Sequence, residues 1–390
     1  MDSWSDCVYK VWLIQNVIAP YRVRLFEEIA KNADFDFRVV LTAPKCRHRP
    51  HWNYDGQSLS FPVLTMKGIN VTSSCDSSLS ISLGLIPSLF WRRPDVVICG
   101  GLGLSTLLVF FYVKFFDKKY IVWSEATQDT KRWRKVGRMR SRLRRSLASG
   151  ANAFIDAGTR SREYLQSLLS EESRIPFFRS YNCVDGSAFS SCGLDTFTRD
   201  KLDNGDRKKI LFVGKLTERK GIPMLLEVYK NIIETSNVPV SLEIVGEGPL
   251  ESDIKHFEHT TKSAKIELRG HVPYSDVAAY YKCCDMFLLL STSDCNPLVV
   301  FEALHAGIPI ICSAHAGNAC DFIVSGKNGY IVDPADKDRI VQRTMEVLSW
   351  DLRKRHGAAE LSRQLVKKAN YHDSAQAFID ACENLLPDKA

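Results

Sequence analysis

Short apolar runs rich in β-branched residues alternate with longer amphipathic segments along almost the whole chain. Strands that alternate with helices join into parallel sheets through right-handed crossovers, with helices on both faces. The pattern therefore predicts an α/β fold class made of doubly wound, Rossmann-like domains. The predicted strands cover residues 10–17, 35–43, 95–101, 120–126 and 153–158, and then 210–216, 241–248, 265–272, 286–292 and 308–314.

A polar break at residues 198–209 separates the two groups of strands. A chain of 390 residues exceeds one typical hydrophobic core, which also favours two domains. We predict an N-terminal domain over residues 1–195, a C-terminal domain over 196–370, and a final helix within 371–390 that is free to cross back to the N-terminal domain. Because ligands of such sheets bind beyond the carboxyl ends of the strands, the loops that follow the strands are where binding residues are expected.

One segment raises the question of a membrane span. Residues 96–113, VVICGGLGLSTLLVFFYV, contain no charge. The run is slightly shorter than the roughly 20 residues that a spanning helix needs, and Gly100 and Gly101 divide it. We predict a buried strand, a glycine turn and a core helix, with a transmembrane helix as the alternative.

The composition, 45% hydrophobic and 25% charged residues, is that of an ordinary soluble globular protein. Twelve cysteines follow no CxxC or other regular spacing, which favours a reducing cytosol. The N-terminus, MDSWSDCVYK, carries acids where a signal peptide would be basic. We therefore expect a cytoplasmic protein.

The first candidate for binding chemistry is the run ILFVGKLTERKG at residues 210–221. A glycine at a strand end lets a ligand approach the backbone, and Lys215 and Lys220 on the following loop can converge on one anion. A helix that starts near Gly221 adds its positive N-terminal dipole. These features indicate a diphosphate cradle around Gly214, and a glycine turn with two solvated lysines is the alternative.

The second candidate is STSDCNPLVVFEALHAGIPIICSAHAGN at residues 291–318. Asp294 and Glu302 are eight residues apart, on either side of Pro297, which suits the first turn of a helix. Backbone amides from Asn296 onwards could hold phosphate oxygens, and Glu302 could accept hydrogen bonds from two sugar hydroxyls. The alternative is an N-capping Asp followed by a surface Glu.

Together these stretches resemble the C-terminal domain of family 4 glycosyltransferases, a retaining, nucleotide-sugar-dependent group of the group 1 type. The resemblance rests on VGKLTERKG, LEIVGEGPL, IELRGHVP, YYKCCDMFLLLSTSDCNPLVVFEALHAGIPII and AGNACDFIVSGKNGYIV, which follow in the family's order and spacing. It is strong over residues 207–333 and weaker in the N-terminal half. It implies a GT-B fold, in which two Rossmann-like domains face each other across a cleft, and a role in polysaccharide or lipopolysaccharide biosynthesis.

The resemblance also implies roles for single residues. The donor-binding set is Gly214, Lys215, Lys220, Val272, Asn296, Pro297, Leu298, Val299 and Glu302, with Gly270 to Val272 beside the base and Glu302 on the ribose. Asp294 would lie close to the transferred sugar, and Asp294, Glu302 and Lys220 form the catalytic set together with Glu125. Three positions depart from the family: Lys215 replaces an arginine, Asp294 a glutamate, and Asn296 an aromatic residue or glycine.

The N-terminal half offers fewer candidates. The run IQNVIAPYRVRLFEEIA at residues 14–30 resembles the strand-loop-helix start of some family members, whose loop faces the cleft. Asn16, Tyr21 and Arg22 are therefore candidates for the acceptor side, although Tyr21 could simply staple the helix start and Arg22 could be solvated. Glu125 ends a predicted strand, where the family often places a polar group near the sugar.

The expected reaction is transfer of a sugar from a nucleotide-diphosphate sugar to a glycan or lipid-linked acceptor, with retention of configuration. Retaining members need no protein nucleophile, which agrees with the lack of a Ser-His-Asp or Cys-His pattern. We expect no cofactor and no metal, and interpret the triplets DFD at 34–36 and DKD at 336–338 as structural. The alternative is a catalytically weakened GT-B protein that binds nucleotides as a partner or scaffold, because of Lys215 and Asp294. The oligomeric state is open.

A basic stretch, KRWRKVGRMRSRLRR at residues 131–145, supplies nine positive charges to a chain whose net charge is +7. As a helix it gathers its predicted membrane-facing residues on one arc: Lys131, Arg134, Lys135, Arg138, Arg142 and Arg145. Val136, Met139 and Leu143 share another arc, continued by Leu147 and predicted to face the core. We expect contact with an anionic membrane surface, with a solvated helix face as the alternative. No nucleic-acid module accompanies the stretch, so a nucleic-acid partner is not expected.

Overall fold

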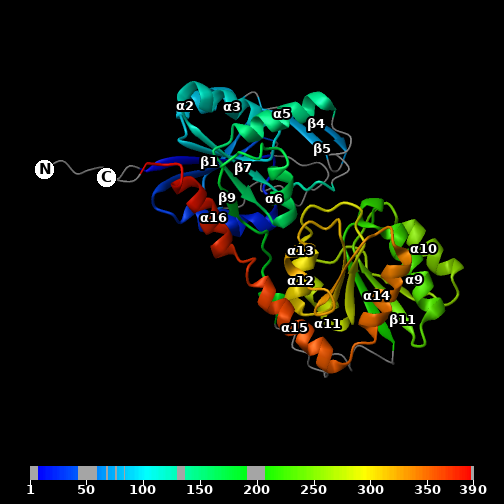
Figure 1. Cartoon of the computed structure of the whole chain (residues 1–390). Helices are drawn as coiled ribbons and strands as arrows, with labels where there is room; N and C mark the ends of the chain where they lie inside the picture. The colour runs from blue at the N-terminus through cyan, green and yellow to red at the C-terminus, as the bar shows by residue number, and fades with distance from the viewer. Residues whose placement is uncertain are drawn as a thin grey trace. The chain divides into compact units, whose positions relative to one another are not determined.

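The computed structural model describes residues 8–42, 59–66, 69–74, 77–82, 84–129, 137–190 and 207–387. It divides into two units, coloured along the chain in Figure 1. Unit 1 comprises Met1–Gln128, Arg132–Cys183 and Ala369–Ala390, and unit 2 comprises Asp129–Lys131 and Val184–Lys368. The sequence predicted the boundary between the two domains at 195/196, where the structure has it at 183/184. It predicted the start of the final segment at residue 371, where the structure has it at 369.

Unit 1 is built on a parallel sheet in the order β3-β2-β1-β6-β7-β8-β9. Its strands are β1 (Tyr9–Gln15), β2 (Phe35–Leu41), β3 (Val63–Thr65), β6 (Val96–Gly100), β7 (Lys119–Ser124), β8 (Ala153–Asp156) and β9 (Phe177–Arg179). An antiparallel hairpin, β4 (Ile69–Ser74) and β5 (Ser77–Ile81), is separate. The predicted strands are confirmed, whereas β3, β9 and the hairpin were missed because they are short or polar.

Helices cover both faces of this sheet. One face carries α2 (Leu85–Arg92), α3 (Leu104–Phe116), α5 (Arg138–Ser149) and α6 (Thr159–Gln166). The other carries α1 (Val23–Ala30), which follows the short helix η1 (Pro20–Arg22), and α16 (Tyr371–Glu383). Side chains alternate along each strand between these two layers, so β1 gives Val11 and Leu13 to one core and Trp12 and Ile14 to the other.

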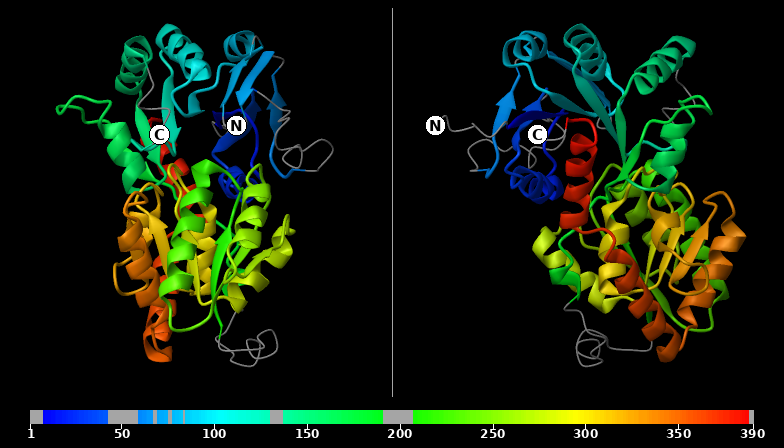
Figure 2. Two further views of the ribbon diagram at one scale, coloured as in Figure 1. Left: turned by 90° about the vertical axis from the view of Figure 1, so that its right-hand side faces the viewer. Right: turned by 60° about the vertical axis from the view of Figure 1, so that its left-hand side comes forward.

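The final helix belongs to unit 1. Helix α16, red in Figure 2, lies beside α1. The ring of Phe378 packs edge-on against Trp123 with 5.0 Å between centroids, and the Ser374 hydroxyl donates to the Tyr181 carbonyl at 3.0 Å. Residues more than 250 positions apart in the chain therefore complete one core.

Unit 2 has a second parallel sheet in the order β12-β11-β10-β13-β14-β15. The strands are β10 (Lys208–Val213), β11 (Val240–Val245), β12 (Ile266–Leu268), β13 (Met286–Leu289), β14 (Ile310–Ser313) and β15 (Gly329–Val332). Its helices are α7 (Ser187–Ser190), η3 (Glu218–Lys220), α9 (Ile222–Thr235), α10 (Glu251–Thr260), α11 (Tyr274–Cys283), α12 (Leu298–Ala306), α13 (Ala319–Phe322), α14 (Lys337–Leu348) and α15 (Leu352–Val366). The five predicted strands are confirmed, and β15 was missed.

The uncharged run 96–113 is strand β6, a turn at Gly101 with φ 91°, and most of helix α3. Across the parts of the chain that are described, no helix is both long enough and apolar enough to cross a bilayer. The prediction of a core helix is wrong for one side of α3, because Phe111 and Phe115 are 63% and 75% exposed.

Candidate active site

The loops after β10, β11 and β12 lie close together, and a glycine follows each of these strands. The Gly214 amide donates to the Val245 carbonyl at 2.9 Å, and the Gly246 amide donates to the Gly270 carbonyl at 2.8 Å. A Cβ on Gly246 would lie 2.0 Å from the Gly214 carbonyl oxygen, and both glycines have positive φ. Only glycine allows this approach at position 246, and the hydrogen bonds through Gly246 and Gly214 join the three strand ends.

The loop after β10 is also fastened to the loop after β13. The Thr292 amide donates to the Arg219 carbonyl at 2.9 Å, and the Arg219 guanidinium donates to the Ser293 carbonyl at 2.9 Å. At Gly221, φ is 79° and a Cβ would lie 2.0 Å from the Leu290 carbonyl oxygen. Glycine is therefore required where η3 turns into α9.

These contacts bring together two predicted site residues that are 74 positions apart. The Lys220 Nζ lies 2.5 Å from Asp294 Oδ2, and the two side chains are only 14% and 13% exposed. A pair so shielded from water interacts more strongly than a surface ion pair. Asp294 does not cap helix α12, whose N-cap is Pro297, so the alternative interpretation of Asp294 as an N-cap is wrong.

Helix α12 begins at the same edge of the sheet. Its N-cap is Pro297, one position before the helical turn where the sequence placed it, and no side chain caps the helix. The Asn318 side chain holds the Pro297 carbonyl at 3.0 Å. Leu298 and Val299 form the first turn, whose backbone amides carry the positive end of the helix dipole.

Glu302 lies one turn further along α12 and is buried, not on the surface. The Tyr281 hydroxyl, from the last turn of α11, donates to its Oε2 at 2.9 Å. Burial raises the pKa of Glu302 to about 7, although the Tyr281 hydrogen bond and the charge on Lys220 lower it. The carboxyl group can therefore change its charge near neutral pH.

In unit 1, the loop after β1 carries Arg22 across to the loop after β7. The Arg22 guanidinium pairs with Glu125, donates to Gln15 Oε1 at 3.0 Å and lies 4.3 Å from the Trp123 ring centroid. Burial lowers the pKa of Arg22, but Tyr21 and Glu125 outweigh that effect, so the pKa is raised overall. Its side chain is 14% exposed, so the solvated alternative is wrong.

The other two acceptor-side candidates lie at the same strand end. Tyr21 is half-buried, with its ring 5.5 Å from the Arg22 guanidinium carbon. Asn16 is exposed, and its Oδ1 accepts a hydrogen bond from Thr42 at 2.9 Å. Asn16 thus joins the ends of β1 and β2, while Arg22 joins those of β1 and β7.

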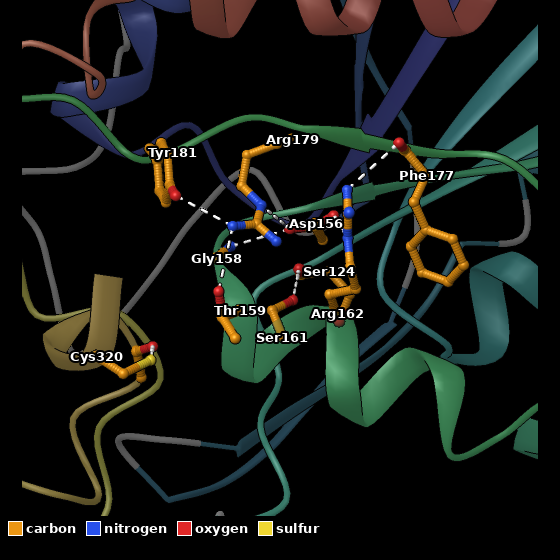
Figure 3. A network of polar contacts seen from close by, with 11 residues as sticks. Ser124, Asp156, Gly158, Thr159, Ser161, Arg162, Phe177, Arg179, Tyr181 and Cys320 are labelled. Carbon is orange, nitrogen blue, oxygen red and sulfur yellow. Dashed lines mark hydrogen bonds and ion pairs between the residues drawn. The ribbon is translucent and has the colours of Figure 1, made fainter. Parts of the chain in front are cut away.

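A third polar cluster, missed in the sequence, fixes the neighbouring strand ends (Figure 3). Asp156 ends β8 fully buried, with Arg162 Nε at 2.8 Å and Arg179 Nε at 2.5 Å. Burial raises its pKa, although both arginines favour the charged form. The Ser161 hydroxyl donates to the Ser124 carbonyl at 2.5 Å, directly before Glu125. The cluster therefore positions the backbone that carries Glu125.

Comparison with known proteins assigns the second half of the chain to a family. The family model described as Glycosyl transferases group 1 matches residues 195–383. This segment is a group 1 glycosyltransferase domain. Its relatives include spore coat protein SA of Bacillus subtilis, 32% identical over 164 residues, which are 39% of this chain and 42% of that protein. An Escherichia coli galactosyltransferase, named as acting on GlcNAc-diphosphoundecaprenol, is 30% identical over 169 residues, 43% of each chain.

A Methanocaldococcus jannaschii relative, named an uncharacterized glycosyltransferase, is 24% identical over 184 residues, 47% of this chain and half of that protein. The matches to these curated relatives thus span half of their length or less. The fold likeness extends further: sucrose-phosphate synthase from Thermosynechococcus elongatus superposes with a TM-score of 0.72 over 97% of this chain and 99% of that one, at 16% identity. Anabaena HepE, solved with UDP, gives 0.74 over 97% and 100%, at 14% identity. The predicted GT-B fold class is confirmed, and the facing of its domains across a cleft stays a prediction.

The remaining donor-site candidates of the glycosyltransferase domain lie on the same loops. Lys215 is exposed, Val272 is half-buried two residues beyond Gly270, and Asn296 is buried. Tyr281 is the residue that sequence reasoning missed. Its only signal is the aromatic pair in YYKCC, which does not reveal that one ring turns inward to Glu302.

The side chains of the two DxD triplets make local contacts. Asp36 forms an ion pair with Arg38 at 2.9 Å, and Asp336 caps α14 by accepting from the Arg339 amide at 3.0 Å. Within the described ranges, no three His, Cys, Asp or Glu side chains gather as metal ligands do. The structural interpretation of the second triplet as a helix start is confirmed.

The basic stretch at residues 131–145 is only partly described. Lys131, Arg134 and Lys135 lie outside the described residues, whereas Arg138, Arg142 and Arg145 are exposed on α5. The prediction that Met139 and Leu143 face the core is wrong, because they are 82% and 39% exposed. Helix α5 buries only its last turn, through Leu147 and Ala148.

Proposed function

We propose that this protein is a retaining glycosyltransferase that moves a sugar from a nucleotide-diphosphate sugar to a glycan or lipid-linked acceptor. The observation that carries the proposal is the Lys220–Asp294 pair at the strand edge where Glu302 is buried. A nucleotide-diphosphate sugar needs a cation beside its diphosphate, a carboxylate beside its sugar and a carboxyl group beside its ribose. Lys220, Asp294 and Glu302 would supply these three groups. The match of residues 195–383 to the group 1 family supports the same reaction class.

In the proposed reaction the bond between the anomeric carbon and the diphosphate oxygen breaks, and a bond to the acceptor oxygen forms on the same face. The leaving phosphate oxygen accepts the acceptor's proton, so no protein nucleophile is needed. Lys220, Lys215 and the first amides of α12 would stabilise the leaving diphosphate, because fixed positive charge acts where negative charge develops. No metal has a step in this scheme.

Other residues would contact the ribose, the base and the transferred sugar of the donor. Glu302 would accept hydrogen bonds from the ribose hydroxyls, and the loop from Gly270 to Val272 would line the base. Asp294 would contact the transferred sugar. Its shorter side chain, compared with glutamate, leaves space of about one methylene, so sugar choice is where this chain should differ from its relatives.

The acceptor would bind to unit 1. Arg22 and Glu125 form a shielded pair at the strand ends, with Asn16 and Tyr21 beside them. One relative is named for a diphosphoundecaprenol-linked substrate, and another is the alpha-monoglucosyldiacylglycerol synthase of Streptococcus pneumoniae, 28% identical over 131 residues, which are 33% of this chain and 29% of that protein. These names support an acceptor carried by a lipid. The proposal places the reaction at the cytoplasmic face of a membrane.

Helix α5 would then dock the enzyme on anionic lipid. Arg138, Arg142 and Arg145 are exposed, and each surface-facing Arg contributes at most about 1 kcal/mol at an anionic leaflet. Binding through these charges should be reversible and weaken with salt. Replacing the three by Gln should weaken binding to anionic vesicles while turnover of a soluble acceptor stays intact.

The donor site is tested by substitution. Lys220→Ala and Glu302→Ala should each abolish the thermal stabilisation by a nucleoside diphosphate and lose sugar transfer or nucleotide-sugar hydrolysis. Lys255→Ala is the matched control, because Lys255 is an exposed lysine of the same unit that pairs only with Glu251 along α10. Full turnover in both site variants would refute the proposal.

A second function is favoured by one observation. Asp294 already neutralises Lys220, and Lys215 cannot form the two-pronged phosphate contact of an arginine. A protein so altered could bind nucleotides as a partner subunit without catalysis. Thermal stabilisation by nucleoside diphosphates, with no transfer to any of a broad set of acceptors, would favour this function.

A further inference from the structure

Helices α2 and α3 leave a set of large apolar side chains in solvent. Trp91 is 89% exposed and Phe115 75% exposed. The set, called here the aromatic face, consists of Ile86, Phe90, Trp91, Phe111 and Phe115. Single exposed apolar residues are normal, but neighbouring ones mark a surface that another molecule covers.

Ring contacts join the two helices within the aromatic face. The Phe90 ring, from α2, lies 5.9 Å from Phe115 and 4.9 Å from Phe116 on α3, measured between centroids. Figures 1 and 2 show the two helices side by side on one side of the unit 1 sheet. Their opposite sides supply Leu89 and Tyr112 to the core. The helices therefore have two apolar sides, of which the sheet covers one.

Helix α3 shows the excess apolar character most clearly. Its 13 residues include a single charged side chain, Lys114. A helix that is apolar all round is normally buried in a protein or in lipid, yet α3 lies at the surface. At 13 residues it is also too short to span a bilayer. The surface that covers it must therefore be one on which the helix lies flat.

The surroundings of the aromatic face are predominantly positive, although Asp117, directly after α3, is an exposed acid. Helices α2, α3 and α5 contain no Asp or Glu. Their exposed cations, together with Arg93 directly after α2, are Arg92, Arg93, Lys114, Arg138, Arg140, Arg142 and Arg145. A second copy of this chain, docked face to face, would oppose like charges. An anionic lipid surface would neutralise them while its interfacial region accepts the aromatic rings.

We propose that the aromatic face inserts into the interfacial region of an anionic bilayer, while the arginines of α5 contact lipid phosphates. The inference deepens the proposed function, on which it rests for the reason a membrane is approached. Insertion of the aromatic face is distinct from the docking of α5, because electrostatic attraction could hold α5 on the lipid surface while α2 and α3 stayed outside the bilayer. Trp91 is expected to reach the acyl–headgroup boundary, where tryptophan side chains prefer to lie.

The test uses the full chain and vesicles of phosphatidylcholine with or without phosphatidylglycerol. The variant is Trp91→Ser with Phe115→Ser, both at exposed positions, and the control is Leu352→Ser, which removes a 69% exposed apolar side chain from unit 2. The double variant should bind anionic vesicles at least about tenfold more weakly than the wild type, and the control should bind unchanged. High salt should abolish binding of the double variant but leave part of the wild-type binding, because apolar contacts are not screened.

Insertion is measured separately with brominated lipids, which quench tryptophan at the boundary. Trp91→Phe should keep vesicle binding and lose part of the quenching. Equal vesicle binding by the wild type and the double variant would overturn the proposal. It would also be overturned if the wild type sedimented as a dimer and the double variant as a monomer, because the aromatic face would then bind a second copy. Nucleotide-sugar turnover measured without vesicles should be the same in the wild type and in the double variant. An absence of turnover in both would refute the proposed function and leave the membrane contact of the aromatic face to the vesicle experiment.

Discussion

Replacing Glu302 with Gln should change how the stability of unit 2 depends on pH. Burial raises the pKa of Glu302 from its ordinary 4.5 to about 7, while the Tyr281 hydroxyl and the charge of Lys220 work in the other direction. A carboxyl with a raised pKa binds its proton more tightly in the folded state. Its contribution to stability is complete below about pH 4.5 and is lost as the pH rises through about 7.

The size of the effect follows from the two pKa values. The difference between 4.5 and about 7 corresponds to about 3 kcal/mol, lost between the acid and the alkaline limits. Screening by solvent hardly reduces this free-energy difference, because Glu302 is only 5% exposed. A glutamine at this position has the same shape and no proton to lose, so the difference between the two proteins isolates the carboxyl group.

Thermal or denaturant unfolding of the wild type and Glu302→Gln, from pH 5 to pH 8, measures this difference. Relative to the variant, the wild type should lose up to about 3 kcal/mol across the range. Glu251→Gln is the control, because Glu251 is a partly exposed carboxylate on α10, and it should unfold in parallel with the wild type. Parallel curves for the wild type and Glu302→Gln would refute the reasoning, since the carboxyl would then titrate alike in both states.

Three further predictions follow from the described contacts. Gly221→Ala should cost more than about 2 kcal/mol in unfolding free energy, because its Cβ would lie 2.0 Å from the Leu290 carbonyl at positive φ, whereas Gly357→Ala in the open interior of α15 should gain about 0.5 to 1 kcal/mol. Arg22→Ala should destabilise unit 1 by about 1 to 3 kcal/mol and raise the KM for the acceptor but not for the donor; Glu125→Gln, which keeps a hydrogen-bond acceptor, should cost less, and an unchanged acceptor KM would speak against an acceptor role. Sugar transfer should persist in excess chelator, and its loss with recovery on adding a divalent ion would contradict the metal-free scheme.

The candidate donor site was largely predictable because its signals are local. A glycine directly after a strand, a lysine on the following loop and a proline before a helix can each be recognised within a few residues. These signals placed Gly214, Lys220 and Glu302 on loops and helix starts at one sheet edge. Which of them touch depends on strand order, and the sequence alone did not pair Lys220 with Asp294.

Side-chain environment was harder to predict. Sequence reasoning named Arg22 and Glu125 for separate roles, and the structure joins them across 103 positions. It missed Tyr281, whose hydroxyl reaches Glu302 only because α11 packs beside α12. It also assigned Met139 and Leu143 to the core from the arc they share, but a helical arc does not reveal whether another element lies against it.

The sequence by itself determined the alternation of strands and helices, the parallel sheets and the strand ends at which the binding motifs lie. These features follow from local periodicity and from the few residues that allow positive φ or start a helix. Only the tertiary structure decided the burial of Glu302, the two shielded ion pairs, the return of α16 to unit 1 and the uncovered side of α3. Burial and pairing depend on which distant segments pack together, and that is a property of the crossovers and not of any short run of residues.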